Sequence, residues 1–245
     1  MNNCLILMTF LLLMPFAVDA DIVVGGDGSR CSEDSACINR IHPDIPMAAS
    51  AKPGERITMK GRDAGDMHLD PDEFAEAESS PRDGFGVVHP LVGPVHIEGA
   101  LAGDVLAVTI EEIRPGPVGW TSASEFGFAG DKVGSESRFI LWRLNDQYAE
   151  SDAIPGVRIP NASFPGVVAT LPNAAQLAGI LDREKRLAEA GGAIYSPDPA
   201  LAEPASLCGE EGTNATECLR TIPPREHGGN MDIRYLQAGV TIYLP

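Results

Sequence analysis

The residues best suited to chemistry gather near the C-terminus of the 245-residue chain, at Glu226, His227, Gly228, Gly229, Asn230 and Asp232. Carboxylates and imidazoles can hold a divalent metal that activates water, and they also act as general acids and bases. An asparagine amide can orient a substrate or stabilise an oxyanion, and paired glycines let the backbone approach a ligand closely. Taken alone, the pattern also fits a plain polar turn with a backbone-bonded histidine and turn-capping acids.

The sequence lacks the residues that other common catalytic mechanisms require. No Gly-x-Ser-x-Gly nucleophile elbow occurs, and no phosphate- or dinucleotide-binding glycine motif stands between a strand and a helix. The cysteines beyond residue 20 form two close pairs, Cys31 with Cys37 and Cys208 with Cys218. We expect two disulfides and no free catalytic thiol. A zinc site on these cysteines is the alternative, disfavoured because no Cys-x-x-Cys spacing is present.

The elements that must position these residues are mostly short strands. The 26 glycines and 20 prolines interrupt helices along the whole chain. Apolar or alternating runs predict strands at 56–60, 86–99, 105–113, 139–144 and 240–244, with 93–99 and 105–113 forming a hairpin whose second strand is buried. Only the segment from Asn173, a fair N-cap, to Ala190 has helical spacing. The sequence therefore predicts a β-rich α+β fold with one or two helices.

The N-terminus predicts an exported protein. Residues 5–14 are apolar, and Val18 and Ala20 are small residues at the −3 and −1 positions of a cleavage site. We take 1–20 as a signal peptide, with an uncleaved anchor as the alternative, and 21–40 as an irregular lead. The expected location is periplasmic or extracellular. Asn161 and Asn214 begin sequons that would carry glycans in a eukaryotic host.

The charge pattern excludes some partners. A net charge of −17 argues against nucleic acids and anionic membrane surfaces, whose protein partners are normally basic. The acidic stretch 62–84 lacks the spacing of a calcium loop, so we expect a solvated loop there.

Two longer segments resemble the acetamidase/formamidase family. One is Gly-Pro-Val-His-Ile-Glu-Gly-Ala with Ala-Gly-Asp-Val-Leu-Ala-Val, within 93–108. The other is Pro-Pro-Arg-Glu-His-Gly-Gly-Asn-Met-Asp-Ile with Ala-Gly-Val-Thr-Ile-Tyr-Leu-Pro, within 223–245. His-Pro-Asp-Ile-Pro at 42–46 and Ile-Pro-Gly-Val-Arg at 154–158 are similar to the formamidase branch in particular. The resemblance marks 41–245 as one acetamidase/formamidase-like domain.

The resemblance implies an amidohydrolase that cleaves the C–N bond of a small aliphatic amide, such as formamide or acetamide, to carboxylate and ammonia. It also implies short strands in packed sheets and a homo-oligomer. From the charge we expect no nucleic-acid partner, and no membrane partner after signal cleavage. The alternative is a non-catalytic secreted β-rich domain, derived from an amidase and used for binding or assembly. Ammonia release from formamide and acetamide separates the two.

Most of the expected site residues, those from 226 to 232, follow from the matched positions. We expect Glu226 to carry a proton and Asn230 to orient the amide, while His227 and Asp232 help to hold a divalent metal such as zinc. The residues expected to contact the substrate are Gly228, Gly229 and His89. For His89, in a strand-forming region, a packed or edge histidine is the simpler interpretation.

The chain departs from the family pattern in two places. Family members normally continue past the Tyr-Leu-Pro strand into Gly-Asp-x-His and Gln-Gly-Asp-Gly-Glu segments, which hold further candidate acids. We therefore expect the C-terminal part of the domain to be missing, and the facing wall of the site to lie beyond Pro245. Phe164 stands where formamidase-like sequences often have histidine.

Overall fold

The computed structural model describes residues 21–67, 87–123, 125, 130–133 and 138–245. The predicted signal peptide 1–20 lies outside the described residues, as do 68–84 of the acidic stretch. Within the described residues, no helix is long and apolar enough to cross a membrane.

The described chain is built from short strands and few helices, which confirms the predicted fold class. The helices are η1 (Cys31–Glu33), α1 (Gly130–Val133), α2 (Ala174–Glu189) and α3 (Ala205–Cys208). The first strands are β1 (Ile22–Val24), β2 (Cys37–Ile38), β3 (Arg40–Ile41), β4 (Ala49–Ala51), β5 (Ile57–Met59), β6 (Leu91–Val92), β7 (Val95–Ile97) and β8 (Leu106–Thr109). The remaining strands are β9 (Val118–Ala123), β10 (Arg138–Leu144), β11 (Tyr148–Glu150), β12 (Arg158–Pro160), β13 (Val167–Ala169), β14 (Leu219–Arg220), β15 (Gly228–Asn230) and β16 (Thr241–Leu244).

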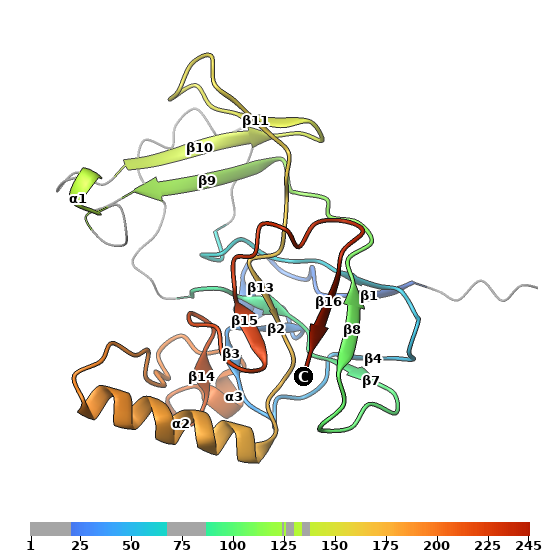
Figure 1. Ribbon diagram of the computed structural model, residues 1–245, viewed down its shortest axis with the longest axis vertical. Helices are drawn as coiled ribbons and strands as arrows, with labels where there is room; N and C mark the ends of the chain where they lie inside the picture. The colour runs from blue at the N-terminus through green and yellow to red at the C-terminus, as the bar shows by residue number, and fades with distance from the viewer. Residues whose placement is uncertain (1–20, 68–86, 124, 126–129, 134–137) are drawn as a thin grey trace, which may run out of the picture.

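The strands pair mostly in twos. One antiparallel sheet has four strands in the order β12-β11-β10-β9, and it lies at the opposite end of the molecule from α2 (Figure 1). Elsewhere β1–β5 and β4–β7 pair parallel, whereas β2–β6, β3–β14, β8–β16 and β13–β15 pair antiparallel. Several of these pairs join segments from opposite ends of the sequence.

The predicted hairpin of 93–99 with 105–113 is wrong. Strand β7 pairs with β4, and β8 pairs with β16 from the C-terminus. Two successive turns, closed by Ala100 N–H to the Ile97 carbonyl (3.1 Å) and Asp104 N–H to the Leu101 carbonyl (3.0 Å), carry the chain away from β7. Most of β8 is also exposed, not buried.

Helix α2 agrees with its prediction and packs over β3 and β14 (Figure 1). Asn173 caps it by accepting a hydrogen bond from Gln176 N–H (2.9 Å), and Gln176 Oε1 accepts one from Asn173 N–H (2.9 Å). Its buried Leu177 and Ile180 contact Ile41 of β3 and Leu219 of β14. Burying such side chains stabilises a fold by roughly 1.5–3 kcal/mol each, so this cluster fixes the position of α2.

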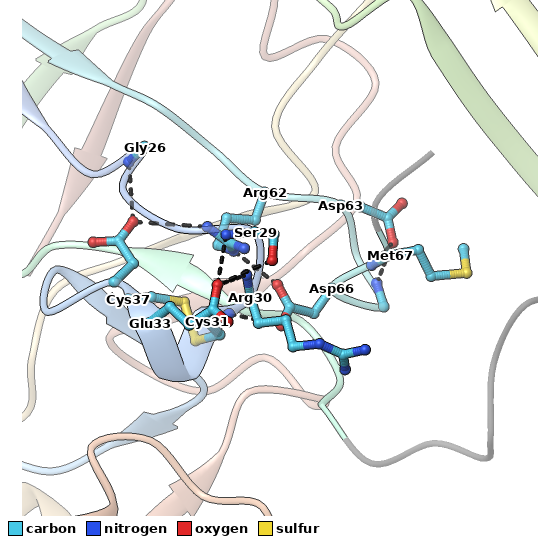
Figure 2. A network of polar contacts seen from close by, with 12 residues as sticks. Gly26, Ser29, Arg30, Cys31, Glu33, Cys37, Arg62, Asp63, Asp66 and Met67 are labelled. Atoms are coloured by element: carbon cyan, nitrogen blue, oxygen red, sulfur yellow. Dashed lines mark hydrogen bonds and ion pairs between the residues drawn. A yellow bond between two sulfur atoms is a disulfide. The ribbon is translucent and has the colours of Figure 1, made fainter. Parts of the chain in front are cut away.

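Both predicted disulfides are present, Cys31 with Cys37 and Cys208 with Cys218. The first lies in a polar junction near the N-terminus (Figure 2). There Asp66 accepts hydrogen bonds from Cys31 N–H and Arg62 Nε, both at 2.7 Å, and its side chain is only 7% exposed. For this described part of 62–84 the expectation of a solvated loop is wrong, because the carboxylate joins two chain segments.

Candidate active site

The predicted site residues lie on a tight hairpin formed by β15 and the residues before it. Arg225 and Gly228 exchange backbone hydrogen bonds of 2.8 and 3.0 Å, so Glu226 and His227 form the turn between them, which we call the 226–227 turn. Strand β15 then pairs with β13, with Gly229 opposite Val168. This hairpin brings the turn against α2.

Gly228 and Gly229 are needed by the protein's own backbone. Their φ angles are 96° and 114°, in the region that favours glycine. A Cβ on Gly228 would lie 2.5 Å from the Val168 carbonyl oxygen, and one on Gly229 would lie 3.2 Å from Pro224 Cα. The glycines thus allow close packing of β15, and their contact with substrate stays a prediction.

His227 is buried, with 2% of its surface exposed. Within the described part of the chain, neither ring nitrogen has a hydrogen-bond partner. Burial lowers the pKa of His227 below its ordinary value, and the charge of Arg225 lowers it further. Backbone groups of His227 itself and of Thr170, and the charge of Glu226, raise the pKa, but they do not outweigh the effect of burial. The imidazole is therefore neutral near pH 7.

Glu226, the other residue of the turn, forms a two-pronged ion pair with Arg183 of α2. Arg183 Nη1 donates to Glu226 Oε1, and Nη2 donates to Oε2 at 3.0 Å. These hydrogen bonds lower the pKa of Glu226 to about 2. Its carboxylate is therefore ionised at neutral pH.

A second, largely buried ion pair joins Arg225, next to the turn, to Glu184 of α2. Arg225 Nε and Nη2 donate to the carboxylate oxygens of Glu184 at 2.6 and 3.1 Å, and Nη1 donates to the Arg220 carbonyl at 2.8 Å. The side chains of Arg225 and Glu184 are 1% and 14% exposed. Screening by water is weak there, so the pair holds the turn at a fixed place on the helix.

A pocket of about 230 Å³ lies between α2 and the turn. Its walls are Gln176, Gly179, Ile180 and Arg183 from α2, with Glu226 and His227 from the turn. Two of the seven predicted site residues line this pocket.

Asn230 and Asp232 lie at the other end of β15, around Gly166. Asn230 Nδ2 donates to the Ile222 carbonyl at 2.9 Å, and Asp232 N–H donates to the Gly166 carbonyl at 3.1 Å. A Cβ on Gly166 would lie 3.0 Å from Asp232 Oδ1 and 3.9 Å from Asn230 Oδ1. The two side-chain oxygens therefore converge on Gly166 and not on the pocket, and the roles expected of both residues stay predictions.

His89 stands apart from the pocket walls. It has a positive φ of 53°, and its N–H donates to the Ala64 carbonyl at 2.9 Å. The carbonyl of its neighbour Val88 accepts a hydrogen bond from Thr221 Oγ1 at 2.9 Å. This bond places His89 beside the segment that leads into the turn, and its contact with substrate stays a prediction.

The described residues do not by themselves assemble a metal site. Among them, no group of three or more His, Cys, Asp or Glu side chains is placed to hold a metal ion. His227 lies just before β15 and Asp232 beyond its end. We therefore derive no chemical step through a metal, and the metal stays a prediction.

The sequence interpretation missed the helical wall of the pocket. Gln176, Gly179, Ile180 and Arg183 recur at helical spacing, which places them on one face of α2. That spacing was visible in the sequence. What the sequence did not show is that the 226–227 turn lies against this face.

The chain is similar to known members of one protein family. Residues 27–245 match the model of the acetamidase/formamidase family. The chain is 33% identical to an acetamidase of Mycolicibacterium smegmatis, over 92% of this chain and 60% of that protein, and 32% identical to a formamidase of Methylophilus methylotrophus, over 89% and 56%.

The chain is also similar to a solved structure. The gamma lactamase from Delftia acidovorans superposes with a TM-score of 0.77 at 31% identity, covering 88% of this chain and 55% of that one. The chain thus spans a little over half the length of these relatives. On the match over residues 27–245, the chain belongs to the acetamidase/formamidase family.

Proposed function

We propose that this chain carries part of the active site of an amide hydrolase, which cleaves the C–N bond of a small linear amide to carboxylate and ammonia. The observation that carries the proposal is the family match along 27–245, with relatives named acetamidase and formamidase at 32–33% identity. Formamide and acetamide are the first substrates to test, because those names point to them. No observation favours the alternative of a non-catalytic binding domain.

The pocket between α2 and the 226–227 turn is the best place in the described chain for the amide. Hydrolysis needs a group that takes a proton from the attacking water and returns one to the leaving nitrogen. A base works best when its pKa is near the working pH. Glu226, with a pKa of about 2, is a weak base, whereas the neutral imidazole of His227 has a free nitrogen lone pair. We assign the proton transfer to His227, with Glu226 held in place by Arg183.

The alternative is that the His227 imidazole binds a metal together with Asp232 and does not act as the base. The test combines ammonia release from formamide and acetamide with metal analysis of the active protein by plasma mass spectrometry. If a metal is needed, Asp232→Ala loses both metal and activity. If His227 acts as the base without a metal, Asp232→Ala keeps activity while His227→Gln loses it. Failure of both this chain and a longer form that spans the full length of the relatives to release ammonia from any linear amide would refute the proposed function.

We also propose export and self-association. Two short-range disulfides suit an oxidising compartment, which supports secretion with cleavage after Ala20. N-terminal sequencing of the mature protein tests the cleavage, and light scattering tests the homo-oligomer. A mature N-terminus at Met1 would contradict cleavage.

A further inference from the structure

We infer that the Cys31–Cys37 disulfide is a redox-dependent positioning device, which fixes segment 62–67 and, through it, the place of the four-stranded sheet of β9–β12 on the rest of the molecule. The oxidised chain holds the sheet where the structure shows it, and the reduced chain releases it. This inference concerns maturation of the chain and does not rest on the proposed amide hydrolysis.

The disulfide joins an exposed segment to a paired strand. Residues 26–30, which lead to Cys31, are exposed, whereas Cys31 and Cys37 are 1% and 3% exposed. Cys37 belongs to β2, which is held by its pairing with β6. An exposed segment has few apolar contacts to hold it, so the S–S bond is the covalent tie that fixes Cys31 against β2.

The backbone of Cys31 in turn holds Asp66. The Cys31 N–H donates to Asp66 Oδ2 at 2.7 Å, and Arg62 Nε donates to the other carboxylate oxygen, also at 2.7 Å (Figure 2). The Asp66 side chain is 7% exposed, so water competes weakly for these bonds. A movement of Cys31 by about 1 Å would take its N–H out of hydrogen-bonding range, which ends at about 3.2 Å between the heavy atoms.

Segment 62–67 also imposes an uncommon backbone conformation on two residues. The φ angles of Asp66 and His89 are 54° and 53°, which are uncommon outside glycine. Asp66 N–H donates to the Asp63 carbonyl at 2.9 Å, and the Ala64 carbonyl accepts a hydrogen bond from His89 N–H at 2.9 Å. Such a conformation persists where surrounding contacts impose it, so loss of the Asp66 contacts lets the segment relax.

Asp63 joins the same segment to the four-stranded sheet. Its Oδ1 accepts hydrogen bonds from the N–H groups of Gly65 and Met67 at 2.8 and 3.1 Å. Its Oδ2 accepts one from the indole N–H of Trp120 at 2.5 Å. Trp120 lies on β9 and stacks on Phe139 of β10, with ring centroids 5.4 Å apart. The position of segment 62–67 therefore determines where the sheet meets the rest of the molecule.

Formation of the S–S bond requires an oxidant. The thiols of Cys31 and Cys37 lose two protons and two electrons, and the disulfide of a thiol–disulfide oxidoreductase takes them up and becomes a dithiol. Oxidising compartments supply such partners, in agreement with the proposed export. Exchange requires access to a sulfur atom, so the buried bond resists later reduction.

The two tryptophans of the chain provide the readout. The Trp120 indole donates to Asp63 across the contact between sheet and segment, whereas Trp142 Nε1 donates to Thr121 Oγ1 within the sheet at 3.1 Å. In ¹⁵N-labelled full chain, the two indole N–H groups give two NMR signals. One signal reports the position of the sheet, and the other reports its internal folding.

The test is a double variant, Cys31→Ser with Cys37→Ser. We expect the Trp120 signal to shift and its indole hydrogen to exchange with solvent about tenfold faster or more, because a hydrogen bond to a charged group is lost, while the Trp142 signal stays unchanged. The matched control replaces both cysteines of the other disulfide by serine and should leave both signals unchanged. An unchanged Trp120 signal in the first variant, or the same change of Trp120 in the control, would overturn the inference.

Asp66→Asn tests the same path with the disulfide intact, and it decides if the cysteine variant does not fold. Asparagine also accepts a positive φ, but it lacks the charge to which Cys31 N–H and Arg62 bond. We expect the Trp120 signal to shift here too, with the Trp142 signal again unchanged. If both signals match those of the parent, the path through Asp66 is wrong and the inference falls.

Discussion

Replacing Glu184 by glutamine should destabilise the protein strongly, because it leaves the charge of Arg225 buried without its partner. Removing one member of a buried ion pair costs about 3–5 kcal/mol. Glu184 keeps 14% exposure and the glutamine carbonyl can still accept one hydrogen bond, so we expect the lower end, about 3 kcal/mol. The free energy of unfolding is measured by urea denaturation.

The same helix supplies the control. Asp182 pairs with Arg186 at 2.8 Å, but these side chains are 62% and 69% exposed, so Asp182→Asn should cost only about 0.3–0.5 kcal/mol. The double variant Glu184→Met with Arg225→Met should recover much of the lost stability, because no charge is left buried. A cost for Glu184→Gln no greater than that for Asp182→Asn would refute the reasoning.

Three further outcomes are expected. Glu226, with its pKa lowered from 4.5 to about 2, stabilises the fold above pH 4.5 and loses this effect as the pH falls towards 2. Because the Glu226 side chain is 55% exposed, it contributes about 0.5 kcal/mol or less to the free energy of unfolding. In urea denaturation, Glu226→Gln should be slightly less stable than the parent at pH 7 and equally stable at pH 2. A larger difference in stability at pH 2 than at pH 7 would contradict this. Replacing both Cys208 and Cys218 by alanine should cost about 2.7 kcal/mol in the same assay, from the entropy of a loop of 10 residues, and no loss would contradict the loop argument. Asp66→Asn should cost about 1.5–3 kcal/mol, because Arg62 and Cys31 lose hydrogen bonds to a charged partner while Arg62 keeps buried Asp34 at 3.7 Å, and a cost near zero would show that water screens these contacts.

Local signals in the sequence predicted local structure well. Asn173, the spacing of Leu177 and Ile180, and the glycines after residue 190 were enough to predict α2, because capping and amphipathic spacing act within one helix. Proximity in sequence was likewise enough to pair the cysteines. The partner of β8 could not be predicted in this way. It lies 132 residues away, where Thr109 meets Thr241, and neither strand carries a mark that identifies the other.

The candidate site was predicted on one side only. The turn containing Glu226 and His227 stood out because its residue types are concentrated in a short stretch. Arg183 and Gly179 did not, since a charged or small residue on an exposed helix face is usually solvated and carries no specific signal. Only the packing of the turn against α2 makes them walls of a pocket. The same holds for Asp66, whose acidic surroundings suggested a solvated loop until its contacts with Cys31 and Arg62 were seen.

The guanidinium of Arg40 shows how late in synthesis this molecule can complete its fold. On β3 it donates hydrogen bonds to the carbonyls of Asp198 and Ala200, which lie 158 and 160 residues further along the chain. Ribosomes add about 5–20 residues per second, so roughly 8–30 s pass between making Arg40 and making its acceptors. During most of that time the nearby Ile41, buried in the finished protein, has no β14 or α2 to cover it. The N-terminal segment therefore leaves the ribosome with exposed apolar side chains that favour aggregation. A chaperone that binds unfolded chains would matter more here than for a fold in which neighbouring segments of the sequence pack together.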